Sequence, residues 1–160
     1  MVSLPAMSSL FSEERPRGVS ALLLRLVSRY PEQFKASHLD VQAIQGWIPL
    51  FGFLCDDVSR LPENAGGYVR WVQIKEKFGS MRARYSIAPE LSEALAQDLR
   101  NKVTALCEQA RNASETSCKI CGAPAFRADQ SMDALLCKRH WFQRMKAPEK
   151  FKQKLAIRIY

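Results

Sequence analysis

Three cysteines and one histidine in the last third of the chain have the spacing of a metal site. Cys118 and Cys121 form a C-x-x-C pair followed by Gly122, and Cys137 and His140 form a later C-x-x-H pair. In structural zinc sites each short loop places two ligands on one side of a tetrahedral ion, and the segment between them folds back. Gly122 suits the tight turn behind the second thiolate. The spacing predicts one structural zinc ion held by Cys118, Cys121, Cys137 and His140.

Other interpretations of this motif are weaker. Free or packed thiols would need no such spacing, and three cysteines with one histidine match none of the common iron–sulfur motifs. Four protein ligands saturate a tetrahedral ion, so the zinc is expected to be structural rather than catalytic. A zinc deaminase would need an H-x-E helix and a proline directly before Cys118, where the chain has Ser117 and no H-x-E. The remaining cysteines, Cys55 and Cys107, are expected to pack in the core.

Few other groups could support catalysis. The chain has two histidines, and the one outside the metal motif, His38, stands between Ser37 and Asp40 in the sequence. Groups of a catalytic triad must converge in space, which sequence neighbours rarely do. Adjacent Asp56 and Asp57 would point to different sides of a helix, and Glu76 is better explained as the partner of a nearby Lys or Arg. The sequence predicts no catalytic residue, and an enzyme of unknown type is the third hypothesis for function.

The positive charge is concentrated in the C-terminal quarter. The 160 residues include 24 Lys and Arg and 16 Asp and Glu, a net charge of +8. Residues 118–160 contain ten of the bases and three of the acids, whereas residues 1–117 are nearly neutral. Such an excess favours an anionic partner. The candidate contacts in this quarter are Lys138, Arg139, Trp141, Arg144, Lys146, Lys150, Lys152, Lys154 and Arg158.

Three helices are expected to position these groups. Apolar residues from Val19 to Tyr30 recur at helical spacing until Pro31, and a second such stripe begins near Gly46 and ends at Pro62. A third stripe runs from Pro89 to about residue 112, with Pro89 suited to the first helical position. This long helix is expected to cover the apolar face of a β-hairpin.

The hairpin is predicted over residues 68–87. A two-residue turn at Gly79-Ser80 would place Lys77 opposite Arg82 and Lys75 opposite Arg84, with Trp71 on the same face. Like charges in directly opposite positions destabilise a sheet, so this face would need carboxylates or a bound anion. Trp71 could stack a base there, or it could pack beneath a helix. The candidate contacts on the hairpin are Lys75, Lys77, Arg82, Arg84 and Trp71.

These elements predict an α+β fold. We expect a small antiparallel sheet, formed by the hairpin at about 68–87, packed by helices and followed by a C-terminal zinc-ribbon-like module. The expected division is an α+β domain over residues 1–116 and a zinc-binding module with a basic tail over 117–160. Alternation in residues 151–160 favours a strand. No stretch has the length and apolar character of a membrane span or a signal peptide, so a cytoplasmic protein without a membrane partner is expected.

Several of these motifs together resemble a group of small uncharacterised proteins encoded by bacteriophages and prophages. The resemblance rests on Gln73-Ile-Lys-Glu-Lys-Phe-Gly79 with the following Met81-Arg82, the later C-x-x-C-G and L-C-x-x-H, and Gly46-Trp-Ile-Pro49. It covers about residues 44–141, with methionine at 81 where leucine is expected. It implies a bacterial host cytoplasm and a zinc-binding C-terminal part, and it favours interaction with nucleic acid or host proteins.

Two functions account for the basic residues. The first is a non-catalytic zinc-binding protein that binds DNA or RNA through its basic, aromatic-interleaved C-terminal region, with weak sequence specificity. The alternative is a phage-type inhibitor or adaptor that binds an acidic surface of a host protein or defence complex, since Arg and Trp are favoured interface anchors. No small-molecule substrate is expected in either case.

Overall fold

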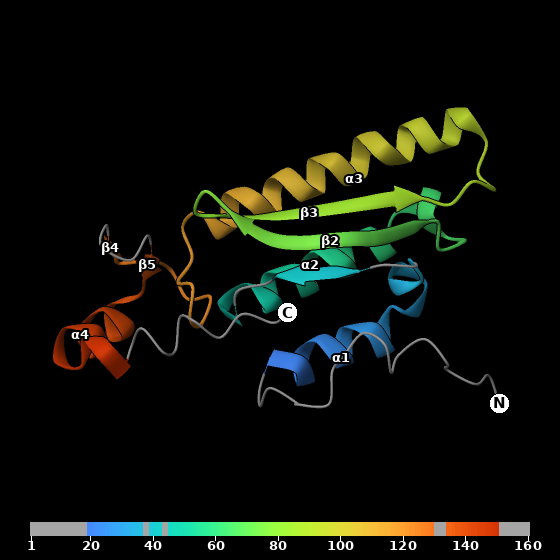
Figure 1. Ribbon diagram of the computed structural model, residues 1–160. Helices are drawn as coiled ribbons and strands as arrows, with labels where there is room; N and C mark the ends of the chain where they lie inside the picture. Colours follow the sequence, from blue (N-terminus) through green and yellow to red (C-terminus); the bar gives the residue numbers. More distant parts are fainter. Residues whose placement is uncertain (1–18, 37–38, 43–44, 130–133, 151–160) are drawn as a thin grey trace.

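Two helices cover one face of a three-stranded sheet, and a smaller segment with its own helix extends from one end (Figure 1). The computed structural model describes residues 19–36, 39–42, 45–129 and 134–150. The expected α+β class is confirmed. In chain order the elements are α1 (Val19–Arg29), β1 (Asp40–Gln42), α2 (Ile48–Ser59), β2 (Val69–Lys77), β3 (Ser80–Ile87), α3 (Glu93–Ser114), β4 (Arg127–Asp129), β5 (Ala134–Leu136) and α4 (Lys138–Lys146), with 3₁₀ turns at Pro31–Phe34, Gln45–Trp47 and Pro62–Asn64.

The helix predictions are confirmed except at one boundary. α1 stops before Pro31, and α2 has Pro49 in its first turn. α3 begins at Glu93 rather than at Pro89. The chain after β3 stays bound to the sheet, since the Ala88 N–H donates to the Tyr68 carbonyl at 2.8 Å. Pro89 therefore follows the end of the strand and begins a turn, a position that its fixed φ also favours.

The sheet is mixed rather than antiparallel. Its order is β1-β2-β3, and β1 runs parallel to β2 with Val41 opposite Ile74. The amide Nε2 of Gln73 donates to the Asp40 carboxylate at 2.5 Å across the same pair of strands. β1 is not predictable from the sequence, because three residues are too few for a periodic pattern. β1 and β3 are therefore the two edge strands of the sheet.

The turn of the hairpin lies one residue earlier than predicted, which shifts the partner of each residue in the strand pairing next to the turn by two. Its turn residues are Phe78 and Gly79, with φ of 52° and 78°, so that Lys77 pairs with Ser80. Two positive φ values identify a type I′ turn, which matches the natural twist of a hairpin. The predicted turn failed because glycine was assigned to the first turn position instead of the second. Each predicted cross-strand pair is wrong in consequence, and Lys75 lies opposite Arg82.

Trp71 lies in the core and not on the basic face. An irregularity between Trp71 and Gln73 shifts β2 so that Trp71 faces the same side as Ile74. Its ring is fully buried and makes edge contacts with Phe51 and Tyr85, at centroid distances of 5.3 and 6.2 Å. The prediction that Trp71 shares a face with the bases is wrong, and its packing beneath a helix is confirmed.

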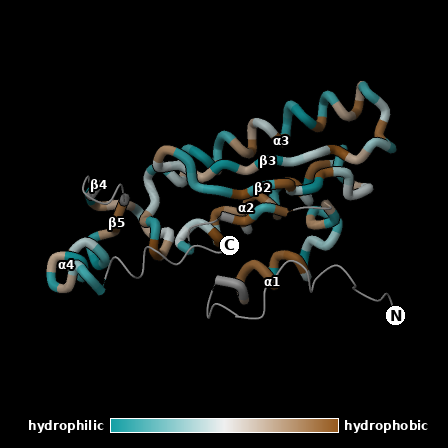
Figure 2. The backbone as a smooth tube through the Cα atoms, in the orientation of Figure 1, coloured by the Kyte–Doolittle hydropathy of each residue, from teal (hydrophilic) through white to brown (hydrophobic). Residues whose placement is uncertain are grey.

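The core lies between the sheet and the helices α2 and α3. Apolar residues concentrate on α1, α2 and the middle of the sheet, whereas α3 and α4 are largely hydrophilic outside their packed faces (Figure 2). The largest fully buried side chains of this core are Trp47, Trp71, Phe51, Ile48, Ile74, Leu99, Val58, Val69 and Val103. No helix among the described residues is long and apolar enough to cross a membrane.

A second, much smaller apolar cluster lies in the C-terminal segment. Its buried members are Cys118, Leu136 and Cys137, and Ile120 and Trp141 pack against it. β4 and β5 form a two-stranded antiparallel sheet next to α4. So small an apolar cluster is typical of segments that a metal ion stabilises. The division of the chain at residue 116 stays a prediction, and the tail 151–160 lies outside the described residues.

Candidate metal centre and basic surfaces

The first pair of ligands lies on a tight turn after α3. The Gly122 N–H donates to the Cys118 carbonyl at 2.8 Å, and the Cys118 N–H donates to the Ala123 carbonyl at 2.7 Å. Gly122 has a φ of 75°, a left-handed conformation that glycine adopts without the strain of a side chain. This turn brings Cys118 and Cys121 to one side of a common point, as the C-x-x-C-G sequence predicts.

The second pair of ligands lies at the start of α4. Cys137 is the N-cap residue of this helix, and His140 lies in its first turn. Burial alone would raise the pKa of the Cys137 thiol, but hydrogen bonds from the backbone N–H groups of His140 and Arg139 and from the neighbouring sulfurs lower it below its usual value. The helix N-terminus thus favours the thiolate, the form that binds metals.

The four side chains converge on one point. The His140 Nδ1 lies 3.4 Å from the Cys118 sulfur and 3.3 Å from the Cys137 sulfur, and the sulfurs of Cys121 and Cys137 are 3.7 Å apart. All four ligand atoms lie within 4.8 Å of one another. Metal–sulfur and metal–nitrogen bonds of about 2.3 and 2.0 Å give tetrahedral edges of roughly 3.3–3.8 Å. The cluster can therefore hold one metal ion.

The first ligand turn packs closely on the 3₁₀ turn Gln45–Trp47, directly before α2. The Gly46 N–H donates to the Lys119 carbonyl at 3.0 Å. A Cβ at Gly46 would lie 2.4 Å from the Cys118 carbonyl oxygen, and one at Gly122 would lie 2.6 Å from the Gly46 oxygen. Two backbones can approach this closely only where both residues lack a side chain. The glycine of the Gly46-Trp47 motif is explained by this contact.

Lys119, between the two cysteines of the turn, joins the metal centre to the hairpin. This residue is only 6% exposed, and the Nζ of its side chain lies 5.8 Å from the centroid of the Trp47 ring. The same Nζ lies 3.9 Å from a carboxylate oxygen of Glu76. That oxygen also accepts the N–H of Gly79 at 2.8 Å, which closes the hairpin turn. Glu76 is thus a structural link between the K-E-K-F-G turn and the C-x-x-C turn.

Replacing Gly46 by alanine should separate the metal centre from the core. The new methyl group would overlap backbone atoms of Cys118 and Lys119. Backbone atoms cannot move aside as the end of a flexible side chain could. We expect the Gly46→Ala variant to lose about 1–3 kcal/mol of unfolding free energy, measured by urea denaturation of the metal-loaded protein. Gly52→Ala is the matched control, because its methyl group would meet only the side chain of Leu26, at 3.3 Å. Equal stability of the two variants would contradict this packing.

The hairpin bases lie together despite the change of register. The side chains of Lys75, Lys77, Arg82 and Arg84 all line one hollow beside β3. Two further residues of this hollow, Phe78 and Arg111, are not among the predicted contacts. Phe78 was assigned to the strand rather than to the turn, and Arg111 lies on α3, where helical spacing gives no indication of a hairpin contact.

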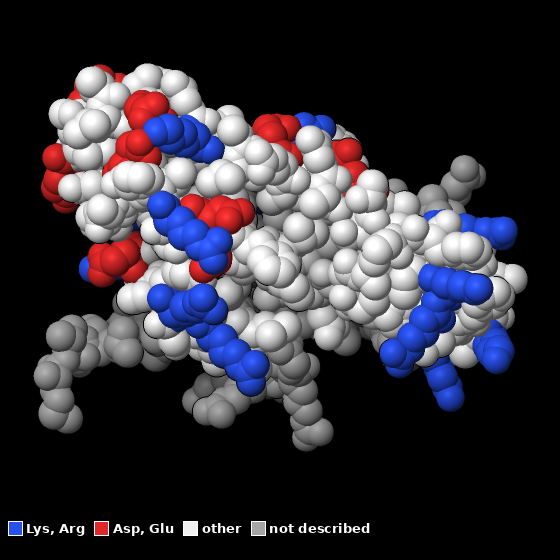
Figure 3. All heavy atoms as spheres, turned by 180° about the vertical axis from the view of Figure 1, so that it is seen from behind, with Lys and Arg blue, Asp and Glu red and all other residues white. Residues whose placement is uncertain are grey.

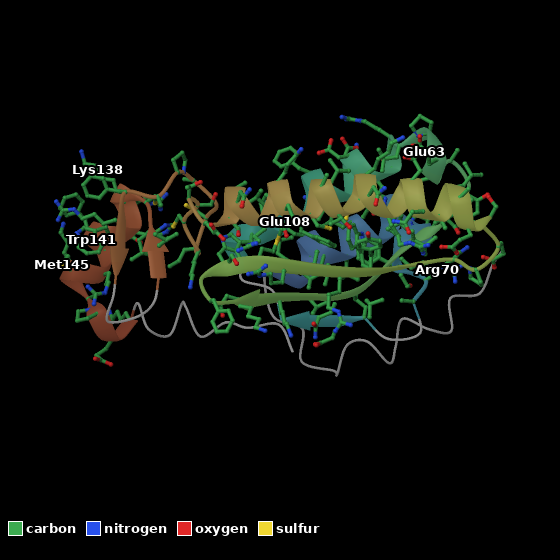
Figure 4. The ribbon with its side chains drawn as sticks, turned by 90° about the horizontal axis from the view of Figure 1, so that it is seen from above. Glu63, Arg70, Glu108, Lys138, Trp141 and Met145 are labelled. Atoms are coloured by element: carbon green, nitrogen blue, oxygen red, sulfur yellow. The ribbon has the colours of Figure 1, made fainter. Side chains whose placement is uncertain are left out.

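The bases of the C-terminal segment surround a tryptophan. The guanidinium carbons of Arg127 and Arg144 lie 5.7 and 5.9 Å from the Trp141 ring centroid. Trp141 itself is half-buried against the small apolar cluster. Among the described residues, the charged side chains of this segment on the face that Figure 3 shows are Lys and Arg, and Lys138, Trp141 and Met145 lie at its outer end in Figure 4. The remaining predicted contacts are Arg139, Lys146 and Lys150, which are exposed, and Lys152, Lys154 and Arg158, which lie outside the described residues.

The remaining candidates for chemistry have structural partners. Asp56 accepts a hydrogen bond from the Tyr30 hydroxyl at 2.8 Å and pairs with Arg29 and Arg60. Burial raises the pKa of the Cys107 thiol to about 12, which keeps it protonated and unreactive. His38 lies outside the described residues.

Comparisons of the chain with protein-family models, with curated proteins and with solved structures find no match.

Proposed function

We propose that this protein is a zinc-stabilised, non-catalytic nucleic-acid-binding protein of the bacterial cytoplasm. Zinc is favoured over other metals because three thiolates and one imidazole are the ligands of many structural zinc sites, and because they fill its tetrahedral coordination. The observation that carries the proposal is the basic surface of the C-terminal segment, where Arg127 and Arg144 flank Trp141. The resemblance of the motifs around Gly46 and Gly79 to those of phage-encoded proteins supports the bacterial setting.

Metal binding leaves most of the positive charge in place. Three thiolates and one Zn²⁺ together contribute −1, against ten bases and three acids in residues 118–160. Trp141 restricts two guanidinium groups at the surface, which lowers the entropy lost when they contact phosphates. Lys138 and Arg139 are exposed one turn away on α4. Contacts of this kind hold a nucleic-acid backbone and carry little sequence information.

Salt dependence tests the proposed function. If about six phosphates are contacted, the logarithm of the association constant should fall with the logarithm of salt concentration at a slope of roughly −5 for duplex DNA. The Lys138→Gln/Arg139→Gln variant should reduce that slope by about 2, as measured by fluorescence anisotropy over a salt series. Arg25→Gln/Lys35→Gln, which removes two exposed charges outside the C-terminal segment, is the control. A flat salt response, or no binding at low salt, would refute the proposal.

A second candidate function is favoured by apolar side chains on α4. Phe142 and Met145 are 50% and 62% exposed beside the bases of that helix. Apolar and cationic groups together are typical of protein interfaces, where they would fit a host protein with an acidic surface. Recovery of a host partner from bacterial lysate with and without nuclease separates the two functions. A partner that is retained after nuclease treatment favours the inhibitor or adaptor, and one that is lost favours nucleic acid.

A further inference from the structure

A basic hollow of about 470 Å³ lies between the edge strand β3 and α3. Lys75 and Lys77 of β2, Arg82 and Arg84 of β3, and Arg111 of α3 contribute to its lining. Glu108, also in the lining, lies on α3 beside the hairpin (Figure 4) and pairs with Arg111 at 3.1 Å. The volume is in the range of small-ligand sites.

The hairpin bases in this hollow have no carboxylate partner among the described residues. Within the part of the chain that the structure describes, no ion pair involves Lys75, Lys77, Arg82 or Arg84, whereas Arg111 pairs with both Glu108 and Glu115. Lys75 and Arg82 lie directly opposite each other on the sheet, an arrangement that is destabilising unless an anion lies between or beside them. The Nε of Arg82 is buried with no hydrogen-bond partner among the described residues. The hollow is therefore complementary to an anion with several acceptor atoms.

An exposed aromatic ring stands at the end of the same hollow. Phe78 is 85% exposed, and the Nζ of Lys77 lies 5.1 Å from its ring centroid. The first position of a type I′ turn favours Asn, Asp or Gly, and a φ of 52° disfavours Phe. Neither packing nor backbone conformation accounts for phenylalanine here. An exposed ring beside cations is the arrangement that stacks an unpaired nucleobase.

We infer that this hollow binds a single-stranded segment of nucleic acid, with phosphates on Lys75, Arg82 and Arg84 and a base stacked on Phe78. The inference rests on the proposed function and specifies its ligand class. A duplex offers no unpaired base for such stacking. An acidic peptide added to the edge of β3 is less favoured, because the Met81 N–H already donates to the Ser114 hydroxyl at 2.8 Å.

The hollow and the C-terminal basic surface are adjacent along the molecule. The turn of the hairpin is the end of the sheet nearest to β4, β5 and α4 (Figure 1). Glu76 and Lys119 connect that turn to the first metal-ligand turn. A single strand in the hollow can therefore continue toward the bases around Trp141.

Phe78 variants test the inference in the metal-loaded full chain. Phe78→Gly removes the ring and relieves the strain of the left-handed φ, so it should stabilise the hairpin. The same variant should bind an oligothymidylate of about 15 nucleotides roughly tenfold more weakly. Binding of a duplex of the same length should change by less than about twofold, because duplex bases cannot stack on the ring. Phe78→Trp keeps an aromatic ring at this position and should bind the single strand at least as tightly as the wild-type protein. Fluorescence anisotropy gives the affinities, and thermal unfolding gives the stabilities.

A charge variant tests the phosphate contacts separately. Lys75→Gln/Arg82→Gln should lower the salt slope for the single strand by about 1.4, and Arg25→Gln/Lys35→Gln should leave it unchanged. Wild-type affinity of Phe78→Gly for the single strand, or an equal loss for single strand and duplex, would overturn the inference and leave the proposed function standing. Failure of the wild-type protein to bind either ligand would refute the proposed function itself.

Discussion

Chelation of the metal is expected to unfold the C-terminal segment from Cys118 to the end of α4. The apolar cluster of this segment has three buried members, Cys118, Leu136 and Cys137, and two of them are candidate metal ligands. Its order must then come from the ion, since structural zinc contributes about 10–16 kcal/mol of apparent binding free energy. Backbone hydrogen exchange of residues 118–146 should rise by orders of magnitude in chelator, while β2 and α3 keep most of their protection.

Two cysteine variants make this prediction specific. Cys118→Ser should abolish the binding of one metal ion per chain, because Cys118 is fully buried at the centre of the cluster. Cys107→Ser should retain it, because Cys107 packs on the main core away from the four ligands. Metal content and hydrogen exchange measure both effects. A C-terminal segment that stays fully protected after complete chelation would contradict the assignment of a structural metal.

Truncation of Trp71 is expected to have the largest effect in the main core. Its indole is fully buried among Phe51 and Tyr85, and its Nε1 donates to the side-chain oxygen of Gln33 at 2.8 Å. Trp71→Ala should cost about 3–5 kcal/mol of unfolding free energy, a large part of the 5–15 kcal/mol typical of a whole domain. It would also leave the buried oxygen of Gln33 without a donor, which adds to the loss. Urea denaturation of the metal-loaded protein provides the measurement.

The Trp71→Phe variant separates the packing of the ring from its hydrogen bond. It retains most of the apolar volume and loses the indole N–H, so we expect a smaller loss of about 1–3 kcal/mol. Neither variant should change nucleic-acid affinity at temperatures where it is folded. A Trp71→Ala variant with native stability and weakened nucleic-acid binding would instead place Trp71 on the binding surface.

The local features of this protein could be predicted from its sequence. The spacing of Cys118, Cys121, Cys137 and His140 is set by two short turns, and each turn is determined by residues next to its own ligands. The three predicted helices were recognisable because their apolar stripes are long and periodic. In the same way, helical spacing of Trp141 and Met145 indicated a turn or two of α4.

The features that sequence reasoning missed depend on distant residues or on rare conformations. Phe78 adopts a left-handed φ that its residue type disfavours, so the turn was placed one residue late. β1 gains its hydrogen bonds from β2, far along the chain. The contact of Gly46 with Gly122 and the ion pair of Glu76 with Lys119 join segments whose sequences give no sign of each other.

The contact between Gly46 and the C-x-x-C turn affects when the main core can finish folding during synthesis on the ribosome. Gly46 and Trp47 are synthesised long before Lys119, whose carbonyl accepts the Gly46 N–H and whose ammonium covers the Trp47 ring. In the proposed metal-bound protein, this corner of the main core is covered only after the last quarter of the chain has emerged and bound its ion. We therefore expect metal supply during translation, and not only afterwards, to determine how much of the newly made protein completes its fold.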